Sequence, residues 1–291
     1  MGFAARHTPD VAASRLIPSD PAGRLVETAE GTVAISEEGP GDGLPILCVH
    51  GIPGSRRDFR YLAPLLAARF RVLRVEMPGF GESPAGPDAH IAAWAKVLLA
   101  VPEALGLDRF ALLSHSFGGG ALLLAGARAG DRLAGLVLLA SMGARRHRSF
   151  ALPPVAYAAL LRLMELPLTR PVVVAVGRSS YRRIGLIPPE SWRELYRHTS
   201  LLASVRLAEL AESARQTTAP ALVAHCLDDR LVEVAIAREL AGILPLGRLV
   251  EYESGGHHLQ KSRAQDLAAE ITSFLTAPAR DRPGRSGVTA T

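Results

Sequence analysis

Short apolar runs alternate with segments of helical periodicity along most of this chain. The runs are apolar at nearly every position and predict strands at 44–49, 70–75, 109–113, 133–140, 221–226 and 248–252. Helical periodicity follows them at 58–69, 90–105, 117–130, 234–244 and 259–275, and Pro102 should bend or restart the second of these helices. Alternating residues on both sides of Glu30-Gly31 predict a hairpin of two further strands at 24–29 and 32–37. Together these elements predict an α/β fold with a mostly parallel sheet of eight strands, covered by helices.

The alternation stops at Ser141 and returns only at Ala221. Between 145 and 218 the sequence is helical but broken by prolines, which predicts an inserted helical segment that leaves and re-enters the sheet edge. The beginning and the end of the chain lack periodicity and are expected to be flexible. The predicted divisions are an N-terminal arm at 1–23, a core at 24–144 and 219–277, the insertion at 145–218, and a disordered tail at 278–291.

The composition fits one α/β domain with an insertion. With 291 residues, 48% hydrophobic and 21% charged, the chain can bury a large core. The first residues hold no apolar targeting segment and no run is long enough to cross a bilayer, so we expect a cytoplasmic protein without a membrane span. The net charge of +5 comes from scattered arginines without interleaved aromatic residues, so nucleic acid is not expected as a partner.

The two cysteines, Cys48 and Cys226, each lie near the end of a predicted strand. In the expected strand order two other strands separate them, which places them about 14 Å apart at the usual interstrand spacing. A disulfide requires much closer Cα atoms. We therefore expect two free, partly buried thiols, in agreement with a reducing compartment.

A serine interrupts the third of the apolar runs, at the point where the strand turns into a helix. Ser116 has small residues two positions before and two positions after it, Ser114 and Gly118, and such residues fit a tight strand-to-helix turn. A turn of this kind lifts the serine hydroxyl above the sheet edge and aims the first amides of the helix at the same point. The segment taken alone is also compatible with a glycine-rich helix start that only packs closely on its strand.

Three of the predicted strand-end loops carry residues that could act together on a substrate. Along the chain they are Ser116, then Asp228 or Asp229, then His257 or His258. A serine hydroxyl becomes a nucleophile when an imidazole takes its proton, and a carboxylate orients that imidazole and stabilises its charge. Only one of two adjacent aspartates in an extended turn can face the histidine.

This order of residues, together with the serine turn, resembles the α/β-hydrolase superfamily. The motifs that carry the resemblance are His50-Gly51-Ile52-Pro53-Gly54, Met77-Pro78-Gly79-Phe80-Gly81-Glu82-Ser83, the turn at Ser116, Asp228-Asp229-Arg230-Leu231-Val232 and Gly256-His257. The resemblance covers 24–275 and implies that the insertion at 145–218 is a cap over the substrate pocket.

The resemblance also implies roles for individual residues. It places the oxyanion hole at the backbone N–H groups of Ile52 and Phe117, and the base at His257, directly after a glycine. It favours Asp229 as the acid, although Glu233 stands where the family has a proline and Asp228 remains the alternative. Relatives that place the acid after the preceding strand offer no alternative, because no Asp or Glu occurs between Asp131 and Glu165. His50 and His115 are expected to make structural hydrogen bonds near strand ends, and His225 is expected to lie in a strand.

With serine as nucleophile, the expected activity is hydrolysis of an ester, lactone or thioester through an acyl-enzyme. Carbon–carbon bond hydrolysis is the alternative within the family, although such relatives commonly use an asparagine near the oxyanion and this chain has none. A non-catalytic binding protein of the same fold is a further alternative, but such members usually have a damaged triad. The residues of the insertion, apolar with scattered arginines, favour a small-molecule substrate with an apolar acyl or aryl group. No cofactor is expected, and the His and Asp residues lack the spacing of metal ligands.

Overall fold

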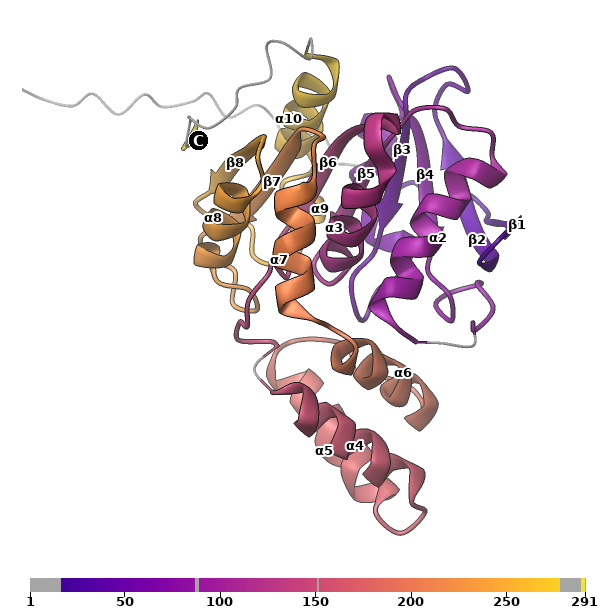
Figure 1. The fold of residues 1–291 in the computed structure, drawn as a ribbon, viewed down its shortest axis with the longest axis vertical. Helices are drawn as coiled ribbons and strands as arrows, with labels where there is room; N and C mark the ends of the chain where they lie inside the picture. The colour runs from indigo at the N-terminus through magenta and orange to yellow at the C-terminus, as the bar shows by residue number, and fades with distance from the viewer. Residues whose placement is uncertain (1–16, 87–88, 151, 278–288, 291) are drawn as a thin grey trace, which may run out of the picture.

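A computed structural model of the chain describes residues 17–86, 89–150, 152–277 and 289–290. The molecule consists of a core built on one sheet and a smaller group of helices that projects from it (Figure 1). Within the described residues, no helix is both long and apolar enough to cross a membrane.

The sheet runs in the order β1-β2-β4-β3-β5-β6-β7-β8-β9. β1 and β2 form the predicted hairpin and β2 pairs with β4 in antiparallel register, whereas every other neighbouring pair is parallel. The strands are β1 (Arg24–Thr28), β2 (Gly31–Glu38), β3 (Pro45–Val49), β4 (Arg71–Glu76), β5 (Phe110–His115), β6 (Leu133–Leu139), β7 (Ala221–Cys226), β8 (Gly247–Tyr252) and β9 (Thr289–Ala290). The predicted mostly parallel sheet is confirmed in its eight strands, β1 to β8. The described residues add the two-residue β9 beside β8.

Helices cover both faces of the sheet, which explains why its central strands are apolar at most positions. All residues of β5, β6 and β7 are buried. One face carries α2 (Ile91–Ala104), α3 (Gly118–Ala129), α7 (Leu207–Gln216) and α8 (Val234–Ile243). The other face carries α1 (Ala63–Leu66), α9 (Leu259–Ser262) and α10 (Ala264–Thr276). Two 3-10 turns, η1 (Arg56–Phe59) and η2 (Gly130–Arg132), complete the core.

Two helices of the core differ from the prediction. The single helix expected at 58–69 is wrong, because the chain forms η1 and then restarts as the short α1, which has Pro64 in its first turn. Proline favours that position because its missing N–H has no partner to lose there. Of the two effects expected at Pro102, a bend or a restart, the restart is wrong, because α2 continues through this proline to Ala104.

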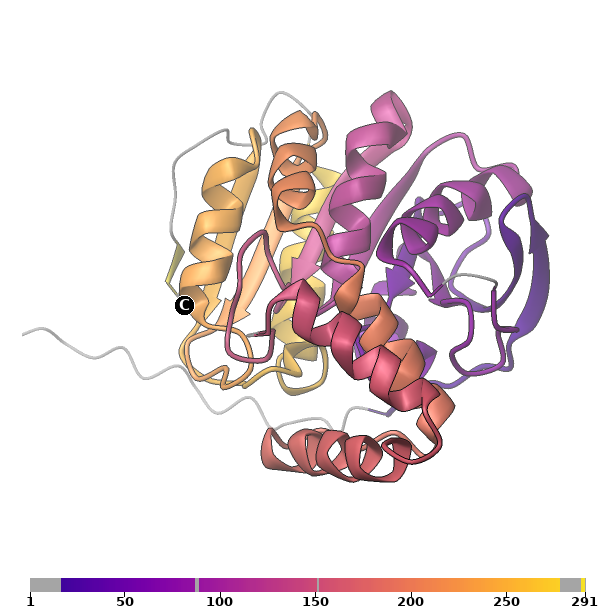
Figure 2. The ribbon, with the colours of Figure 1, turned by 60° about the horizontal axis from the view of Figure 1, so that its bottom comes forward.

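Three helices form a separate group that we call the helical lobe: α4 (Pro154–Glu165), α5 (Arg170–Arg183) and α6 (Trp192–Ala203). Figures 1 and 2 show it at one end of the sheet, with α6 nearest to the core. The Arg197 guanidinium of α6 donates to the Gly79 carbonyl, and the Ser204 hydroxyl after α6 accepts from the Ile91 N–H at 2.9 Å. By contrast α7, although within the range predicted for the insertion, lies on the sheet beside α3 and buries Leu210 and Ala214 there.

The described residues include part of each chain end and both cysteines. Within the predicted N-terminal arm, residues 1–16 lie outside the described residues, and the Ser19 N–H donates to the Arg60 carbonyl at 2.8 Å. Within the predicted tail, 278–288 and 291 lie outside the described residues, and the remaining two residues form β9. Cys48 on β3 and Cys226 on β7 are free and buried, with β5 and β6 between them as predicted.

Candidate active site

Ser116 lies in the sharp turn between β5 and α3. Its φ of 54° places a residue with a side chain in the left-handed region, as a strained strand-to-helix turn requires. The turn also approaches the loop after β3 so closely that a Cβ at Gly118 would lie 2.6 Å from the His50 carbonyl oxygen. Ser114, which replaces the first glycine of the usual pattern, is fully buried in β5.

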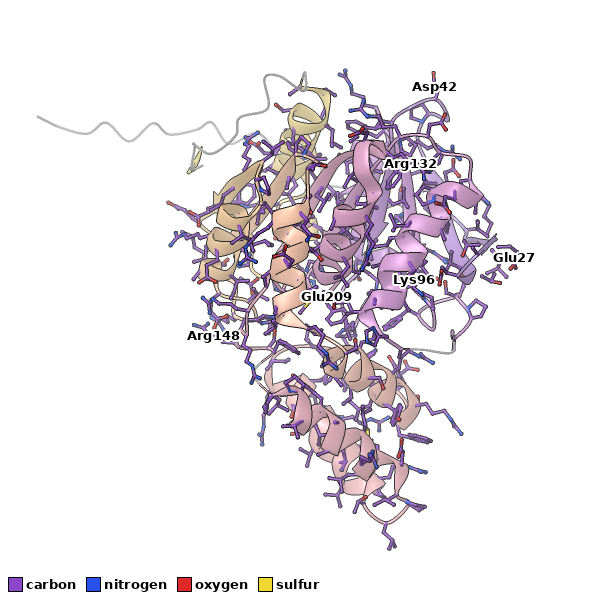
Figure 3. The ribbon with its side chains drawn as sticks, viewed as in Figure 1. Glu27, Asp42, Lys96, Arg132, Arg148 and Glu209 are labelled. Carbon is purple, nitrogen blue, oxygen red and sulfur yellow. The ribbon has the colours of Figure 1, made fainter. Side chains whose placement is uncertain are left out.

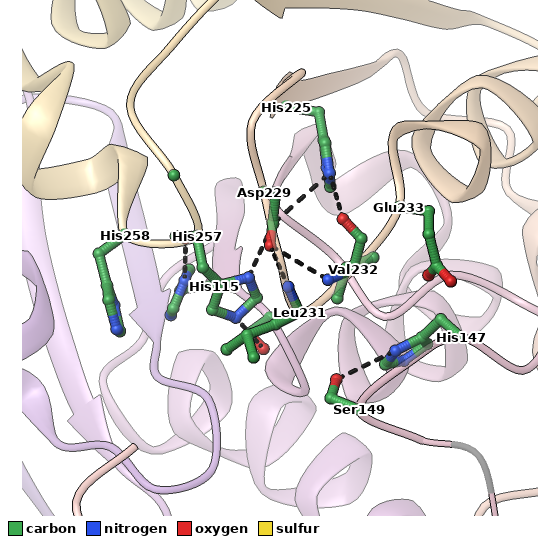
Figure 4. A network of polar contacts seen from close by, with 12 residues as sticks. His115, His147, Ser149, His225, Asp229, Leu231, Val232, Glu233, His257 and His258 are labelled. Atoms are coloured by element: carbon green, nitrogen blue, oxygen red, sulfur yellow. Dashed lines mark hydrogen bonds and ion pairs between the residues drawn. The ribbon is translucent and has the colours of Figure 1, made fainter. Parts of the chain in front are cut away.

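The three residues favoured by the resemblance form one hydrogen-bonded chain, although they come from three different loops. Figure 4 shows Asp229 and His257 side by side within it. His257 Nε2 lies 2.8 Å from the Ser116 hydroxyl oxygen, and His257 Nδ1 lies 2.8 Å from Asp229 Oδ2. Asp229 is only 5% exposed, and its Oδ1 accepts from the backbone N–H groups of Leu231 and Val232 at 2.8 and 3.1 Å. The carboxylate is therefore held by two donors on one side and by the imidazole on the other.

Asp228, the alternative acid, occupies a different place. Its side chain is exposed, and its two oxygens accept from the backbone N–H groups of Gly255 and Gly256 at 3.2 and 2.8 Å. These glycines directly precede His257. The adjacent aspartates thus face opposite ways, and Asp228 anchors the loop that carries the histidine.

The surroundings of Asp229 keep its carboxylate ionised. Burial on its own would raise the pKa of Asp229, but the hydrogen bond and charge of His257 and the N–H groups of Val232 and Leu231 together hold that pKa below its usual value. An ionised acid next to His257 Nδ1 leaves the proton on Nδ1 and the lone pair of Nε2 facing the serine.

Two backbone N–H groups border Ser116 without an acceptor. Within the described part of the chain, neither the N–H of Ile52 nor that of Phe117 makes a hydrogen bond, and both residues line the pocket at Ser116. Phe117 immediately precedes α3, whose N-terminal end carries the positive pole of the helix dipole. These are the two positions at which the resemblance places an oxyanion hole.

Two buried histidines hold the loops of this site together, as expected for His50 and His115. His50 Nδ1 donates to the Gly51 carbonyl and its Nε2 accepts from the Met77 N–H, so its ring joins the loops after β3 and β4. This pairing requires a neutral ring, and burial lowers the pKa of His50 to about 4. His115 Nε2 lies 2.8 Å from the His257 carbonyl oxygen, and burial likewise holds the pKa of His115 well below its usual value.

No pattern along the chain indicated where two further histidines lie in the site. His225 lies in β7 as predicted, but its Nε2 is also 3.5 Å from Asp229 Oδ2 and 2.9 Å from the Val232 carbonyl oxygen. His147 comes from the inserted segment, lines the pocket at Ser116 and bonds through Nδ1 to the Ser149 hydroxyl at 3.1 Å. Burial lowers the pKa of His147 to about 4. His258, the alternative to His257, is exposed and is not among the lining residues.

The pocket at Ser116 has a volume of about 100 Å³ and lies between the core and the helical lobe. Besides Ser116 and His257, its walls are mainly apolar and include Ile52, Met142 and Phe150. No lysine or arginine is among the described residues that line it. Within the described residues, no group of three or more His, Cys, Asp or Glu side chains is placed to hold a metal ion.

Comparison with known proteins agrees with this architecture. The chain is 27% identical over 248 residues to the 2-hydroxymuconate semialdehyde hydrolase of Pseudomonas sp. (strain CF600), covering 81% of this chain and 88% of that protein. It is 26% identical over 262 residues to the magnesium-chelatase 30 kDa subunit of Rhodobacter capsulatus, covering 83% and 90%. The crystal structure of the enol-lactonase from Burkholderia xenovorans LB400 superposes with a TM-score of 0.70 at 20% identity, over 87% of this chain and all of that one.

A family model decides the assignment. Residues 46–270, which include every residue of the hydrogen-bonded chain and both unpartnered N–H groups, match the model described as the alpha/beta hydrolase family. The match extends over most of the chain, and the solved structures that superpose on it show the same fold. The expected family and its enzymatic character are confirmed: the chain belongs to the alpha/beta hydrolase family.

Proposed function

We propose that this protein is a serine hydrolase that cleaves an ester-type bond, with Ser116 as nucleophile, His257 as base and Asp229 as the acid that orients it. The observation that carries the proposal is the chain of two hydrogen bonds of 2.8 Å from the serine hydroxyl through the imidazole to the buried carboxylate. The free N–H groups of Ile52 and Phe117 support it, because an acyl-transfer site needs donors for the oxyanion.

The proposed reaction has two halves. In the first, His257 Nε2 takes the hydroxyl proton while Ser116 Oγ attacks the substrate carbonyl carbon, and the N–H groups of Ile52 and Phe117 stabilise the resulting oxyanion. The intermediate then collapses, His257 returns the proton to the leaving oxygen or sulfur, and an acyl-enzyme remains. In the second half, water replaces the serine hydroxyl as the attacking group, and the acid product leaves with the serine restored. Each step uses only protein groups and water.

Asp229 acts in both halves by stabilising the imidazolium that forms on His257. Because Leu231 and Val232 donate to Asp229 Oδ1, the carboxylate cannot rotate away from the imidazole without losing two hydrogen bonds. This fixed geometry favours one tautomer of His257 throughout the cycle.

The walls of the pocket favour an apolar acyl or aryl group as the part of the substrate next to the scissile bond. A small apolar pocket without a lysine or arginine offers nothing to neutralise a charged group buried beside Ser116. Neutral esters, lactones and thioesters meet this requirement.

Carbon–carbon bond hydrolysis is the second candidate, and sequence similarity to two named hydrolases favours it. The chain is similar along most of its length to two proteins named 2-hydroxymuconate semialdehyde hydrolase, at 27% and 28% identity. The pocket without cationic side chains argues against this candidate, because the substrate in that name carries a carboxylate.

Turnover rates of the wild-type protein and Ser116→Ala on a substrate panel test these alternatives. The panel contains activated aryl esters, lactones, thioesters and 2-hydroxymuconate semialdehyde. We expect turnover of the neutral acyl compounds that Ser116→Ala abolishes, and labelling of Ser116 by a fluorophosphonate detected by mass spectrometry. Ser273→Ala is the matched control. Ser273 is exposed on α10, which packs on the face of the sheet opposite to α3. Activity confined to the semialdehyde would overturn the ester assignment, and failure of all substrates and of labelling would overturn the enzymatic proposal.

A further inference from the structure

A second cavity lies inside the helical lobe, away from the sheet. It has a volume of about 570 Å³ and is lined by side chains of α4, α5 and α6, including Leu160, Met164, Val173 and Leu195. The pocket at Ser116 has only about 100 Å³. The larger cavity is within the range of about 300–1000 Å³ that small-molecule sites occupy, whereas the smaller one has room only for atoms close to the scissile bond.

The two cavities adjoin one another. Four residues line both cavities, so the lobe cavity begins where the pocket at Ser116 ends. They are Ser149, Tyr181, Ile184 and Leu202. Tyr181 is held at this junction by its hydroxyl, which lies 3.1 Å from His198 Nδ1. The His198 ring in turn stacks on Phe80 of the core at a centroid distance of 5.4 Å. The junction is therefore fixed to the core, although Tyr181 and Leu202 belong to the lobe.

The polar side chains of the lobe cavity already have partners within the protein. The Thr199 hydroxyl donates to the Leu195 carbonyl at 2.8 Å, and the Ser180 hydroxyl donates to the Val176 carbonyl at 3.0 Å. The cation at the edge, Arg148, lies where the chain leaves the core (Figure 3), and its Nε is 3.6 Å from Glu233. A ligand thus meets mainly apolar surface in this cavity and gains most by burying apolar atoms.

The far side of the lobe cavity opens to solvent through an apolar rim. Val172 and Val176, on successive turns of α5, both line the cavity, yet they are 66% and 60% exposed. Leu152 combines lining and exposure in the same way. An opening of this kind admits a long apolar group from solvent, and such a group can reach past the junction towards Ser116.

We propose that the lobe cavity binds the alkyl chain of an amphiphilic ester whose scissile bond lies at Ser116. This inference rests on the proposed function and names the class of its substrate. The atoms next to the carbonyl carbon occupy the small pocket, and the rest of the chain passes the junction at Tyr181 into the lobe. Each methylene that moves from water into this cavity strengthens binding by about fourfold.

Aryl esters from acetate to dodecanoate test the inference with a matched pair of variants. Val173→Trp fills the lobe cavity, whereas Val155→Trp makes the same change on α4 at a side chain that is 72% exposed and does not line the cavity. We expect kcat/KM of the wild type to rise at least thirtyfold along the series. Val173→Trp should lower the dodecanoate value more than tenfold and change the acetate value less than twofold, and Val155→Trp should match the wild type on both.

Two further measurements complete the test. Acetate esters of long alcohols, assayed in parallel, show whether the chain belongs to the acyl part or to the leaving group, and a preference for chain length in either series supports the site. If Val173→Trp also loses acetate activity, Leu160→Ala replaces it: this variant enlarges the cavity, and its preferred chain should become longer than that of the wild type.

Binding to Ser116→Ala separates failure of this inference from failure of the proposed function. An uncharged fluorescent long-chain alkyl amide should bind this variant, the aryl ester of dodecanoate should displace it, and Val173→Trp added to it should weaken binding more than tenfold. Probe binding of this kind without hydrolysis of any ester supports the tail site and overturns the proposed function. Ser116-dependent hydrolysis without a chain-length preference, together with absence of probe binding, overturns the tail site and leaves the proposed function standing.

Discussion

Asp229→Asn tests the proposed acid most sharply, because the structure fixes how the new side chain must lie. The Asp229 oxygen Oδ1 accepts from the N–H groups of Leu231 and Val232, so the asparagine must place its carbonyl oxygen there. Its NH2 group then faces His257 Nδ1 at the 2.8 Å contact. Because an amide N–H can only donate at that point, His257 must carry its own proton on Nε2, where it can no longer accept the proton of Ser116.

This wrong tautomer should lower kcat by about 10⁴-fold, equivalent to about 5.4 kcal/mol of the activation barrier. The neighbouring variant Asp228→Asn is the control. Its oxygen can keep the 2.8 Å bond to the Gly256 N–H and loses only the longer contact with Gly255, so kcat should fall less than about tenfold.

Initial rates with an activated aryl ester give kcat and KM for both variants, and thermal unfolding verifies that each is folded. The reasoning predicts that Asp229→Asn loses kcat with little change in KM, because the substrate contacts neither aspartate in the proposed mechanism. Equal losses in the two variants, or a larger loss in Asp228→Asn, would refute the assignment of the acid.

Three further predictions follow from the site and its surroundings. Ser116→Ala and His257→Ala should each lower turnover by roughly 10⁴- to 10⁶-fold, and the double variant should be no slower than the worse single one; effects that multiply contradict a shared mechanism. The free energy of unfolding should fall as pH drops from about 6.5 to about 4, because the buried His50 has a pKa of about 4 and only the unfolded chain takes up its proton in that window. This one group gives a slope of about 1.4 kcal/mol per pH unit in urea titrations, and a His50→Gln variant with an unchanged slope contradicts the assignment. Gly118→Ala should destabilise the protein by about 1–3 kcal/mol in the same assay, because its Cβ meets a backbone carbonyl. Gly242→Ala on α8, where a Cβ meets no atom within 4 Å, should be neutral or stabilising, and equal effects of the two glycine variants would contradict the packing argument.

Local pattern was enough to predict the strands and most of the helices. Nearly continuous apolar runs predicted β5, β6 and β7 because a strand covered on both faces buries every side chain and is therefore apolar at most positions. The failures lie at prolines. Pro64 restarts a helix and Pro102 does not, and the difference depends on where each proline falls within its helix.

The division between the inserted segment and the core shows a limit of periodicity. An amphipathic helix has the same pattern whether it packs on a sheet or on other helices, so α7 could not be distinguished from α4, α5 and α6 in the sequence. Only the fold places the buried side of α7 against α3 and the sheet, and α4, α5 and α6 against one another around the lobe cavity.

The sequence by itself determined the family, the parallel sheet and the order of serine, aspartate and histidine along the chain, because these depend on residue type and spacing. The tertiary structure decided which of the two adjacent aspartates faces His257 and which anchors its loop. It also decided that His225 lies against Asp229 and that His147 reaches the pocket from the insertion. The physical reason is that hydrogen bonds and cavities form between segments distant in sequence, and their geometry depends on the packing of the whole sheet and lobe rather than on any local pattern.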